Sequence, residues 1–351
     1  MKKQCIIPIF VPHLGCPNNC TFCNQKKISG QLKPVTPEDA RKQIEYYLKN
    51  FKENKIEKEI AFFGGSFTAI DRKLQEELLK VAYEYKKLKK VQGIRLSTRP
   101  DCIDKAELKL LKKYGVTTIE LGVQTTNDYL LKKCKRGHSF EDVKKASKLI
   151  RRSGFILGHQ MMVGLPESTR LDELNTAKDL AKLKPKIMRI YPVLVIKGTE
   201  LEQEYKLKKY EPLSVEQAVE ICKELNKFFM NRRIEVIRIG LQNTDTITSP
   251  DDPKSEVIAG PYHECFRQLV ESSFWYDKIV EKIKSFSVRV KKVEIKVNEK
   301  DVNYAVGYKR ENIDKLEQIY NVKAKFEQED KIKHGKLKIN VIERYKDFID
   351  E

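Results

Sequence analysis

Residues 11–27 read VPHLGCPNNCTFCNQKK and place three cysteines, Cys16, Cys20 and Cys23, within eight positions. Their spacing is C-x3-C-x2-C, and no fourth cysteine stands nearby in the sequence. An iron–sulfur cube normally takes four thiolates, so a cube held by three keeps one iron open to a substrate or cofactor. The spacing therefore favours a cluster that binds a further ligand.

Zinc is the alternative ligand for these thiols. His13 precedes Cys16 by three residues, and together with the three cysteines it would complete a four-ligand Cys3His zinc site. Paired zinc ligands are commonly separated by two residues, which makes the first gap of this motif less typical of zinc. A zinc-stabilised RNA-binding protein without enzymatic activity remains the non-enzyme interpretation.

The composition indicates a globular chain with a strong positive charge. The 351 residues include 69 Lys and Arg against 50 Asp and Glu, a net charge of +19. This charge fits a polyanionic partner such as RNA, although lysines interleaved with glutamates on helix faces produce the same balance. No apolar run is long enough to span a membrane, and the N-terminal residues do not resemble a signal peptide. With clustered rather than paired cysteines, we expect a cytoplasmic protein and no membrane partner.

Short apolar runs alternate with helical patterns as far as about residue 240. Near-continuous apolar strands of this kind are typical of parallel sheets covered on both faces, in either a barrel or a doubly wound sheet. We predict an α/β fold, a partial parallel (β/α)6 barrel that is open on one side. Strands are expected at residues 4–10, 58–64, 93–98, 117–123, 155–163 and 187–195, with a possible seventh at 233–240. Helices are expected at 37–53, 71–89, 104–113, 140–152, 170–182 and 214–231.

Glycines and polar residues occur where these strands end. Gly64, Gly65 and Ser66 follow the second strand, while Glu120 lies on the fourth strand and Gln124 ends it. Parallel barrels place their chemistry at the carboxyl ends of the strands, the same edge to which the cysteines are assigned. The sequence therefore predicts one site at this edge.

Several segments resemble a known family. These are GGSFTAID (64–71), STRPD (97–101), ELGVQT (120–125), CKRGHSFEDVKKASKLIRRSGF (134–155) and MMVGLPES (161–168). Together with the cysteine spacing, they resemble the radical S-adenosylmethionine (SAM) domain of the Elongator catalytic subunit and its bacterial relatives. They are more distantly similar to oxygen-independent coproporphyrinogen oxidases. The resemblance covers about residues 4–285.

The resemblance implies a 4Fe–4S cluster on the three cysteines and SAM on its open iron. By this likeness the glycine pair meets the SAM amino group, Glu120 the ribose hydroxyls, and Gln124 the surroundings of the sulfonium. A basic residue pairs with the SAM carboxylate, and a strand backbone faces the adenine. The residues expected to bind SAM are Gly64, Gly65, Ser66, Glu120, Gln124, Arg151 and Val195; those expected to bind metal are Cys16, Cys20 and Cys23.

The activity implied by the resemblance is reductive cleavage of SAM to a 5′-deoxyadenosyl radical. The substrate is expected to be RNA, specifically tRNA, and the electron donor a small reductant such as flavodoxin or ferredoxin. Elongator-like sequences tend to carry a histidine where Gln160 stands, and we expect no acetyltransferase domain here. The Elongator reaction is therefore not carried over. A radical SAM enzyme that acts on a small molecule such as a porphyrinogen is the alternative.

The remaining sequence suggests three parts. They are a radical SAM barrel (1–240), a turn-rich connection with a helix (241–284) and a small α+β module (285–351). In the module, Gly307-Tyr308-Lys309-Arg310 is expected to follow a strand and resembles the GXXG loop of KH RNA-binding units. Arg310 replaces the second glycine, so an ordinary turn is the alternative.

Two histidines, His159 and His263, are candidate general acids. We interpret both as packed, hydrogen-bonded side chains.

Overall fold

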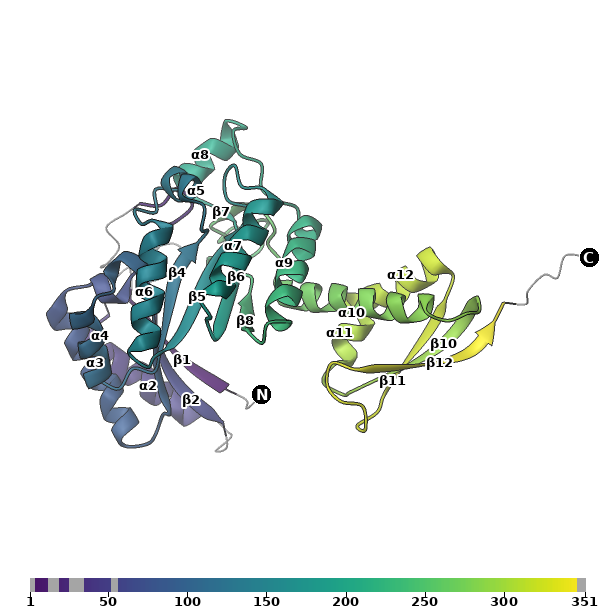
Figure 1. The fold of residues 1–351 in the computed structure, drawn as a ribbon, viewed down its shortest axis with the longest axis horizontal. Helices are drawn as coiled ribbons and strands as arrows, with labels where there is room; N and C mark the ends of the chain where they lie inside the picture. Colours follow the sequence, from purple (N-terminus) through teal and green to yellow (C-terminus); the bar gives the residue numbers. More distant parts are fainter. Residues whose placement is uncertain (1–3, 12–18, 25–34, 52–55, 346–351) are drawn as a thin grey trace, which may run out of the picture. The chain divides into compact units, whose positions relative to one another are not determined.

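The computed structural model describes residues 4–11, 19–24, 35–51 and 56–345 (Figure 1). The chain divides into two compact units. The first comprises Met1–Ala218 and Leu225–Glu264, and the second comprises Val219–Glu224 and Cys265–Glu351. Residues 241–264 therefore belong with the sheet of the first unit. Helix α10 (Phe266–Lys284) belongs with the C-terminal module.

A sheet of seven parallel strands, curled into a half-barrel, forms the centre of the first unit (Figure 1). The strand order follows the sequence from β1 to β6 and ends with β8. This arrangement confirms the predicted partial barrel, and β8 is the seventh strand. The strands are β1 (Gln4–Val11), β2 (Glu57–Gly64), β3 (Gly93–Thr98), β4 (Thr118–Gln124), β5 (Ile156–Val163), β6 (Ile187–Pro192) and β8 (Glu235–Ile239).

Helices connect the strands, as every parallel connection requires a crossover. Several start at a capping box, in which a threonine or serine and an acidic residue three positions later bond each other's backbone, as Thr36 and Asp39 do. The helices are α2 (Pro37–Asn50), α3 (Arg72–Lys87), α4 (Lys105–Lys113), α5 (Asp128–Lys133), α6 (Phe140–Arg152), α7 (Arg170–Lys182), α8 (Glu200–Lys206) and α9 (Val215–Met230). None of the helices in the described part of the chain is long and apolar enough to cross a membrane.

The sequence run 187–195 does not form one strand. β6 ends at Pro192, and a separate two-residue strand, β7 (Val195–Ile196), pairs in antiparallel fashion with β9 (Val257–Ala259). Proline has no backbone N–H to donate to a neighbouring strand, which explains why β6 ends at Pro192.

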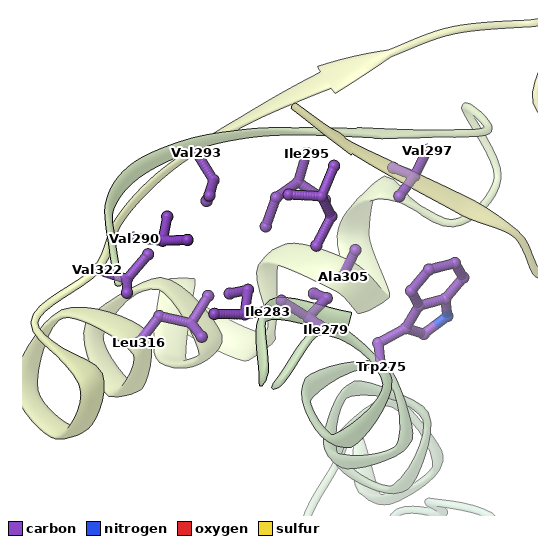
Figure 2. Close-up of a cluster of buried hydrophobic side chains, with 11 residues drawn as sticks. Trp275, Ile279, Ile283, Val290, Val293, Ile295, Val297, Ala305, Leu316 and Val322 are labelled. Carbon is purple, nitrogen blue, oxygen red and sulfur yellow. The ribbon is translucent and has the colours of Figure 1, made fainter. Parts of the chain in front are cut away.

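The second unit is the predicted small α+β module. Its three-stranded sheet has the order β11-β10-β12 and packs on α10 and α12 through one hydrophobic core, which includes Trp275, Val293 and Leu316 (Figure 2). The elements after α10 are β10 (Val290–Val297), α11 (Val302–Val306), α12 (Glu311–Tyr320), β11 (Lys323–Gln328) and β12 (Leu337–Arg344).

The expected strand before Gly307 is wrong. Residues Val302–Val306 form the short helix α11, so the loop at 307–310 lies between two helices. Gly307 has a φ of +88°, and a Cβ there would lie 2.7 Å from the backbone nitrogen of Asn312. The Asn312 side chain donates to the carbonyls of Tyr304 and Ala305, which ties the two helices together.

Candidate functional site

Two cysteines of the C-x3-C-x2-C motif, Cys20 and Cys23, lie on a loop held at the carboxyl edge of the sheet. Cys20 is buried and Cys23 is partly buried, while Cys16 lies outside the described residues. The Cys23 N–H donates to the Cys20 carbonyl at 3.0 Å, so the two residues share one turn. Thr21 fixes this turn, since its N–H donates to Cys134 and its carbonyl accepts from Leu201. The ends of α5 and α8 therefore position the two thiols.

Arg136 links this loop to the sheet. One of its terminal nitrogens lies 3.2 Å from the Cys20 Sγ, and the other donates to the Gly122 carbonyl on β4 at 2.6 Å. Arg136 is buried, so this pair of contacts holds the cysteine loop against β4 from inside the protein. Arg136 lies in the segment CKRGH, which resembles the family, but the sequence alone gave no role for this side chain.

The glycine pair brings the ends of β1 and β2 together. Gly64 has a φ of +111°, and a Cβ there would lie 2.5 Å from the Val11 carbonyl oxygen. The Gly65 N–H donates to the same oxygen at 3.0 Å. The buried Ser66 hydroxyl lies 2.8 Å from the Thr98 hydroxyl and accepts from the Arg99 N–H. Ser66 therefore joins β2 to β3, and its predicted contact with SAM stays a prediction.

We expect Gly64→Ala to lower the free energy of unfolding by roughly 2–4 kcal/mol, because the new Cβ meets backbone and the residue is strained. Gly154→Ala is the matched control. Gly154 also has a positive φ, +83°, but a Cβ there meets nothing within 4 Å, so a loss of about 1 kcal/mol is expected. Urea unfolding of both variants measures the difference. Equal losses would show that the close approach to Val11 costs nothing.

Gln124 has features of a ligand-binding residue. It is a non-glycine residue with a φ of +74°, it is buried, and its Oε1 has no hydrogen-bonding partner among the described residues. The pairing of β4 with β5 shifts register between Gly122 and Gln124. Buried polar atoms are normally paired and strained residues cluster at functional sites, so these features agree with the expected role of Gln124, whose contact with SAM stays a prediction.

His138 lies near the same edge and was not singled out in the sequence. Burial, together with the charges of Arg136 and Arg99, lowers the pKa of His138 to about 4. Its imidazole is therefore neutral at physiological pH. Neither ring nitrogen has a hydrogen-bonding partner of good geometry within the described part of the chain.

Glu120 belongs to a buried network of charges on the inner face of the barrel. Its carboxylate accepts from Arg95 on β3 at 2.8 Å and from Arg189 on β6 at 2.5 Å. Gln160 donates to it at 3.1 Å, and Arg95 also pairs with Glu59 on β2. Burial raises the pKa of Glu120, but the guanidinium groups of Arg189 and Arg95 outweigh that effect and hold it below its usual range.

This network satisfies the carboxylate of Glu120 without a ligand. The predicted contact with the SAM ribose therefore stays a prediction, and it requires at least one of these hydrogen bonds to be exchanged. Two arginines, one on each side of β4, supply the structural partners of Glu120.

A cavity of about 190 Å³ opens beside this network within the first unit. Aromatic rings, two guanidinium groups and amide side chains surround it. Its wall includes Phe10, Phe63, Gly64, Ser97, Gln160, Arg189, Tyr191, Arg238 and Gln242. The Arg189 guanidinium lies 4.9 Å from the Phe63 ring centre, so the charge network forms part of the wall. Such a cavity accommodates a flat, polar group next to the glycine pair.

The structure does not bring Arg151 to this edge. Arg151 is in the last turn of α6, is exposed, and donates to the Leu183 carbonyl near the amino end of β6. The helix runs antiparallel to the strands, which places its C-terminus at the opposite edge of the sheet. Val195, by contrast, is fully buried and packs in the same hydrophobic cluster as Cys20. Its predicted contact with adenine stays a prediction.

His159 is a packed histidine, as interpreted from the sequence. Its Nε2 lies 2.9 Å from the Ser147 hydroxyl, and complete burial lowers its pKa to about 3. His263 is partly buried.

Comparison with known families agrees with this geometry. Residues 10–180 match the model of the radical SAM superfamily, and residues 185–275 match that of the Radical_SAM C-terminal domain. The chain belongs to the radical SAM superfamily. The superfamily match includes the cysteine motif and the glycine pair, and the match to the C-terminal domain includes β6 and β8.

Individual relatives place the chain near Elongator-type proteins. It is 35% identical over 188 residues to a tRNA uridine(34) acetyltransferase of Methanocaldococcus jannaschii. The aligned segment covers 48% of this chain and 34% of that protein. It is 27% identical over 183 residues to human Elongator complex protein 3, 46% of this chain and 34% of that protein. The chain thus spans about a third of the length of these relatives.

A solved structure shows the same fold. Elp3 of Methanocaldococcus infernus, with an N-terminal deletion, superposes with a TM-score of 0.60 over 80% of this chain and 64% of that chain, at 24% identity.

Proposed function

We propose that this radical SAM enzyme binds a 4Fe–4S cluster through Cys16, Cys20 and Cys23 and cleaves SAM reductively to modify an RNA, specifically tRNA. The observation that carries the proposal is the buried contact of Arg136 with Cys20, together with a Gln124 oxygen that has no hydrogen-bonding partner among the described residues. The names of the tRNA-modifying relatives support the choice of substrate.

The described residues fit this cofactor pair. Two thiols share one turn in a pocket of apolar side chains, and the buried Arg136 guanidinium contacts one of them. A Cβ at Gly64 would meet the Val11 backbone, so this glycine lets the ends of β1 and β2 lie close together at the edge where the cofactor is proposed to bind. Gln124 offers an oxygen for a hydrogen-bond donor. When bound, the cluster and SAM together supply the electron transfer and the radical that abstracts hydrogen from the substrate.

The chain's own residues orient and shield these groups. Arg136 holds the cysteine loop against β4, and Phe22, Leu165 and Val195 exclude water from the side of the loop. The Glu120 network fixes Arg189 in the cavity wall, where it limits the positions that a substrate can take. The reductant is proposed to be flavodoxin or ferredoxin.

The test measures SAM cleavage and RNA choice separately. Anaerobic protein with dithionite should convert SAM to 5′-deoxyadenosine, even slowly without substrate. Folded tRNA should compete for the protein at least ~10-fold better than heparin or an unstructured RNA of equal length, a margin of ~1.4 kcal/mol that charge alone does not supply.

Lys309→Glu with Arg310→Glu should reduce that margin and leave SAM cleavage unchanged, because both residues lie in the C-terminal module. If tRNA competes no better than heparin while SAM is still cleaved, the enzyme acts on a small molecule such as a porphyrinogen.

A further inference from the structure

A groove of about 580 Å³ lies at the amino edge of the barrel sheet, opposite the cysteine loop. Two parallel connections form it, namely α7 with its turn into β6 and α9 with its turn into β8. The Glu235 N–H donates to the Lys186 carbonyl at 3.1 Å, which fixes the two turns side by side. We call this the β6–β8 groove; Lys178, Ala181, Lys182, Lys184, Pro185, Lys186, Phe228, Arg232, Arg233 and Ile234 line it.

The charge of the β6–β8 groove is not balanced locally. Its lining contains four lysines and two arginines and no acidic residue. Within the described part of the chain, Lys182 pairs with Asp179 at 2.8 Å, and the other five cations form no ion pair. Some exposed lysines elsewhere do have an acidic partner, as Lys135 has in Glu200. Like charges on one concave surface repel each other, so a bound anion would stabilise them.

Helix ends explain only part of this charge. Cations near a helix C-terminus are favoured by the helix dipole, and both α7 and α9 end at the groove. That effect falls off within the last turn, whereas Lys186 lies at the start of β6.

One arginine in the groove is held in place. The Arg232 guanidinium carbon lies 3.7 Å from the centre of the Phe228 ring, and one of its nitrogens donates to the Phe228 carbonyl. A guanidinium stacked in this way keeps its other N–H groups in one plane, the arrangement that suits bidentate contact with phosphate. The surrounding lysines add point charges.

We propose that the β6–β8 groove binds the phosphate backbone of a structured RNA, at a contact separate from the cysteine edge. The six-residue strand β6 separates the two edges by roughly 20 Å at ~3.3 Å per residue, a span that a folded RNA can bridge. Backbone contacts position an RNA without reading its sequence, which leaves base selection to the barrel cavity. This inference rests on the proposed RNA substrate.

The test is the double substitution Lys184→Glu with Arg233→Glu in the full-length protein. Both residues have the left-handed backbone conformation, with φ of +55° for Lys184 and +57° for Arg233. We expect tRNA affinity at physiological salt to fall at least ~10-fold. The slope of log K against log salt should fall by about 2, because two phosphate contacts are lost.

The matched control is Lys89→Glu with Lys208→Glu. Each of these lysines also follows a helix and has the left-handed backbone conformation, with φ of +56° for Lys89 and +55° for Lys208. Both lie outside the groove, and their replacement changes the net charge by the same amount. We expect this control to lose less than ~3-fold in affinity. A second groove variant, Lys184→Gln with Arg233→Gln, removes both charges without reversing them and should also lose affinity for tRNA. Circular dichroism verifies that all variants are folded.

Equal losses of tRNA affinity in the groove and control variants would overturn the proposed binding role of the groove and leave only a general attraction between charges. SAM cleavage without RNA should be unchanged in every variant. Wild-type protein that cleaves SAM but shows no preference for tRNA would overturn both the RNA substrate and the groove. Failure to cleave SAM at all would instead count against the proposed chemistry.

Discussion

Cys20→Ala is expected to abolish the iron–sulfur cluster and all reductive cleavage of SAM. Anaerobically purified wild-type protein should be brown and contain about four irons and four sulfides per chain, as three thiolates on an open-iron cube require. Cys20 is the thiol that Arg136 contacts, so the substitution also removes the contact through which Arg136 joins the loop to β4. Iron and sulfide analysis with absorption spectroscopy measures the outcome, and Cys16→Ala and Cys23→Ala should behave alike.

Two other buried cysteines are the controls. Cys134 packs in the same hydrophobic cluster as Cys20, and Cys222 is fully buried elsewhere. Burial raises the pKa of Cys134 to about 11, so its thiol is protonated and is not expected to bind metal. Cys134→Ala and Cys222→Ala should both keep the cluster. Stoichiometric zinc without sulfide in the wild-type protein would instead support the zinc-stabilised, non-enzymatic interpretation.

Glu120→Ala is expected to destabilise the protein by about 3–5 kcal/mol, the usual cost of removing one partner of a buried ion pair. The substitution leaves Arg95 and Arg189 without the carboxylate that both now contact inside the barrel. Glu84→Ala is the comparison, because Glu84 pairs with Arg41 on the surface with 41% of its side chain exposed. That loss should be at most about 1 kcal/mol. Denaturant unfolding of the two variants provides the measurement.

Glu120→Gln separates the structural role from the predicted ribose contact. The amide keeps the packing, and SAM affinity can be measured on folded protein. A carboxylate that accepts ribose hydroxyls would lose hydrogen bonds worth ~1.5–3 kcal/mol each, whereas a purely structural residue would leave the affinity unchanged. If Glu120→Gln lowers the stability but leaves the SAM affinity unchanged, the role of Glu120 is purely structural.

The pH dependence follows from the same network. Because the pKa of Glu120 is lowered in the folded protein, its contribution is complete above the unfolded value near 4.5 and is lost as the pH falls through the folded pKa.

The sequence by itself determined the strand–helix alternation, the cysteine loop and the edge at which the site lies. Apolar runs bounded by glycine and polar residues predict parallel strands, and parallel strands bring their carboxyl ends to one edge wherever they lie in the chain. Gly64 and Gln124 were therefore assigned to the site before any contact was known. The short helix at Val302–Val306 was missed because five residues carry too little periodicity to separate a helical turn from a strand.

Only the tertiary structure decided which side chains meet. Arg136 and Cys20 are 116 positions apart, and their contact depends on how the helix after β4 returns to the cysteine loop. The partners of Glu120 come from β3 and β6, which strand order and register select. Arg151 is a different case, because it ends the helix before β5, and a helix that returns to the next parallel strand ends at the amino edge of the sheet. Local patterns specify elements, while contacts across the sheet follow from the packing of the whole chain.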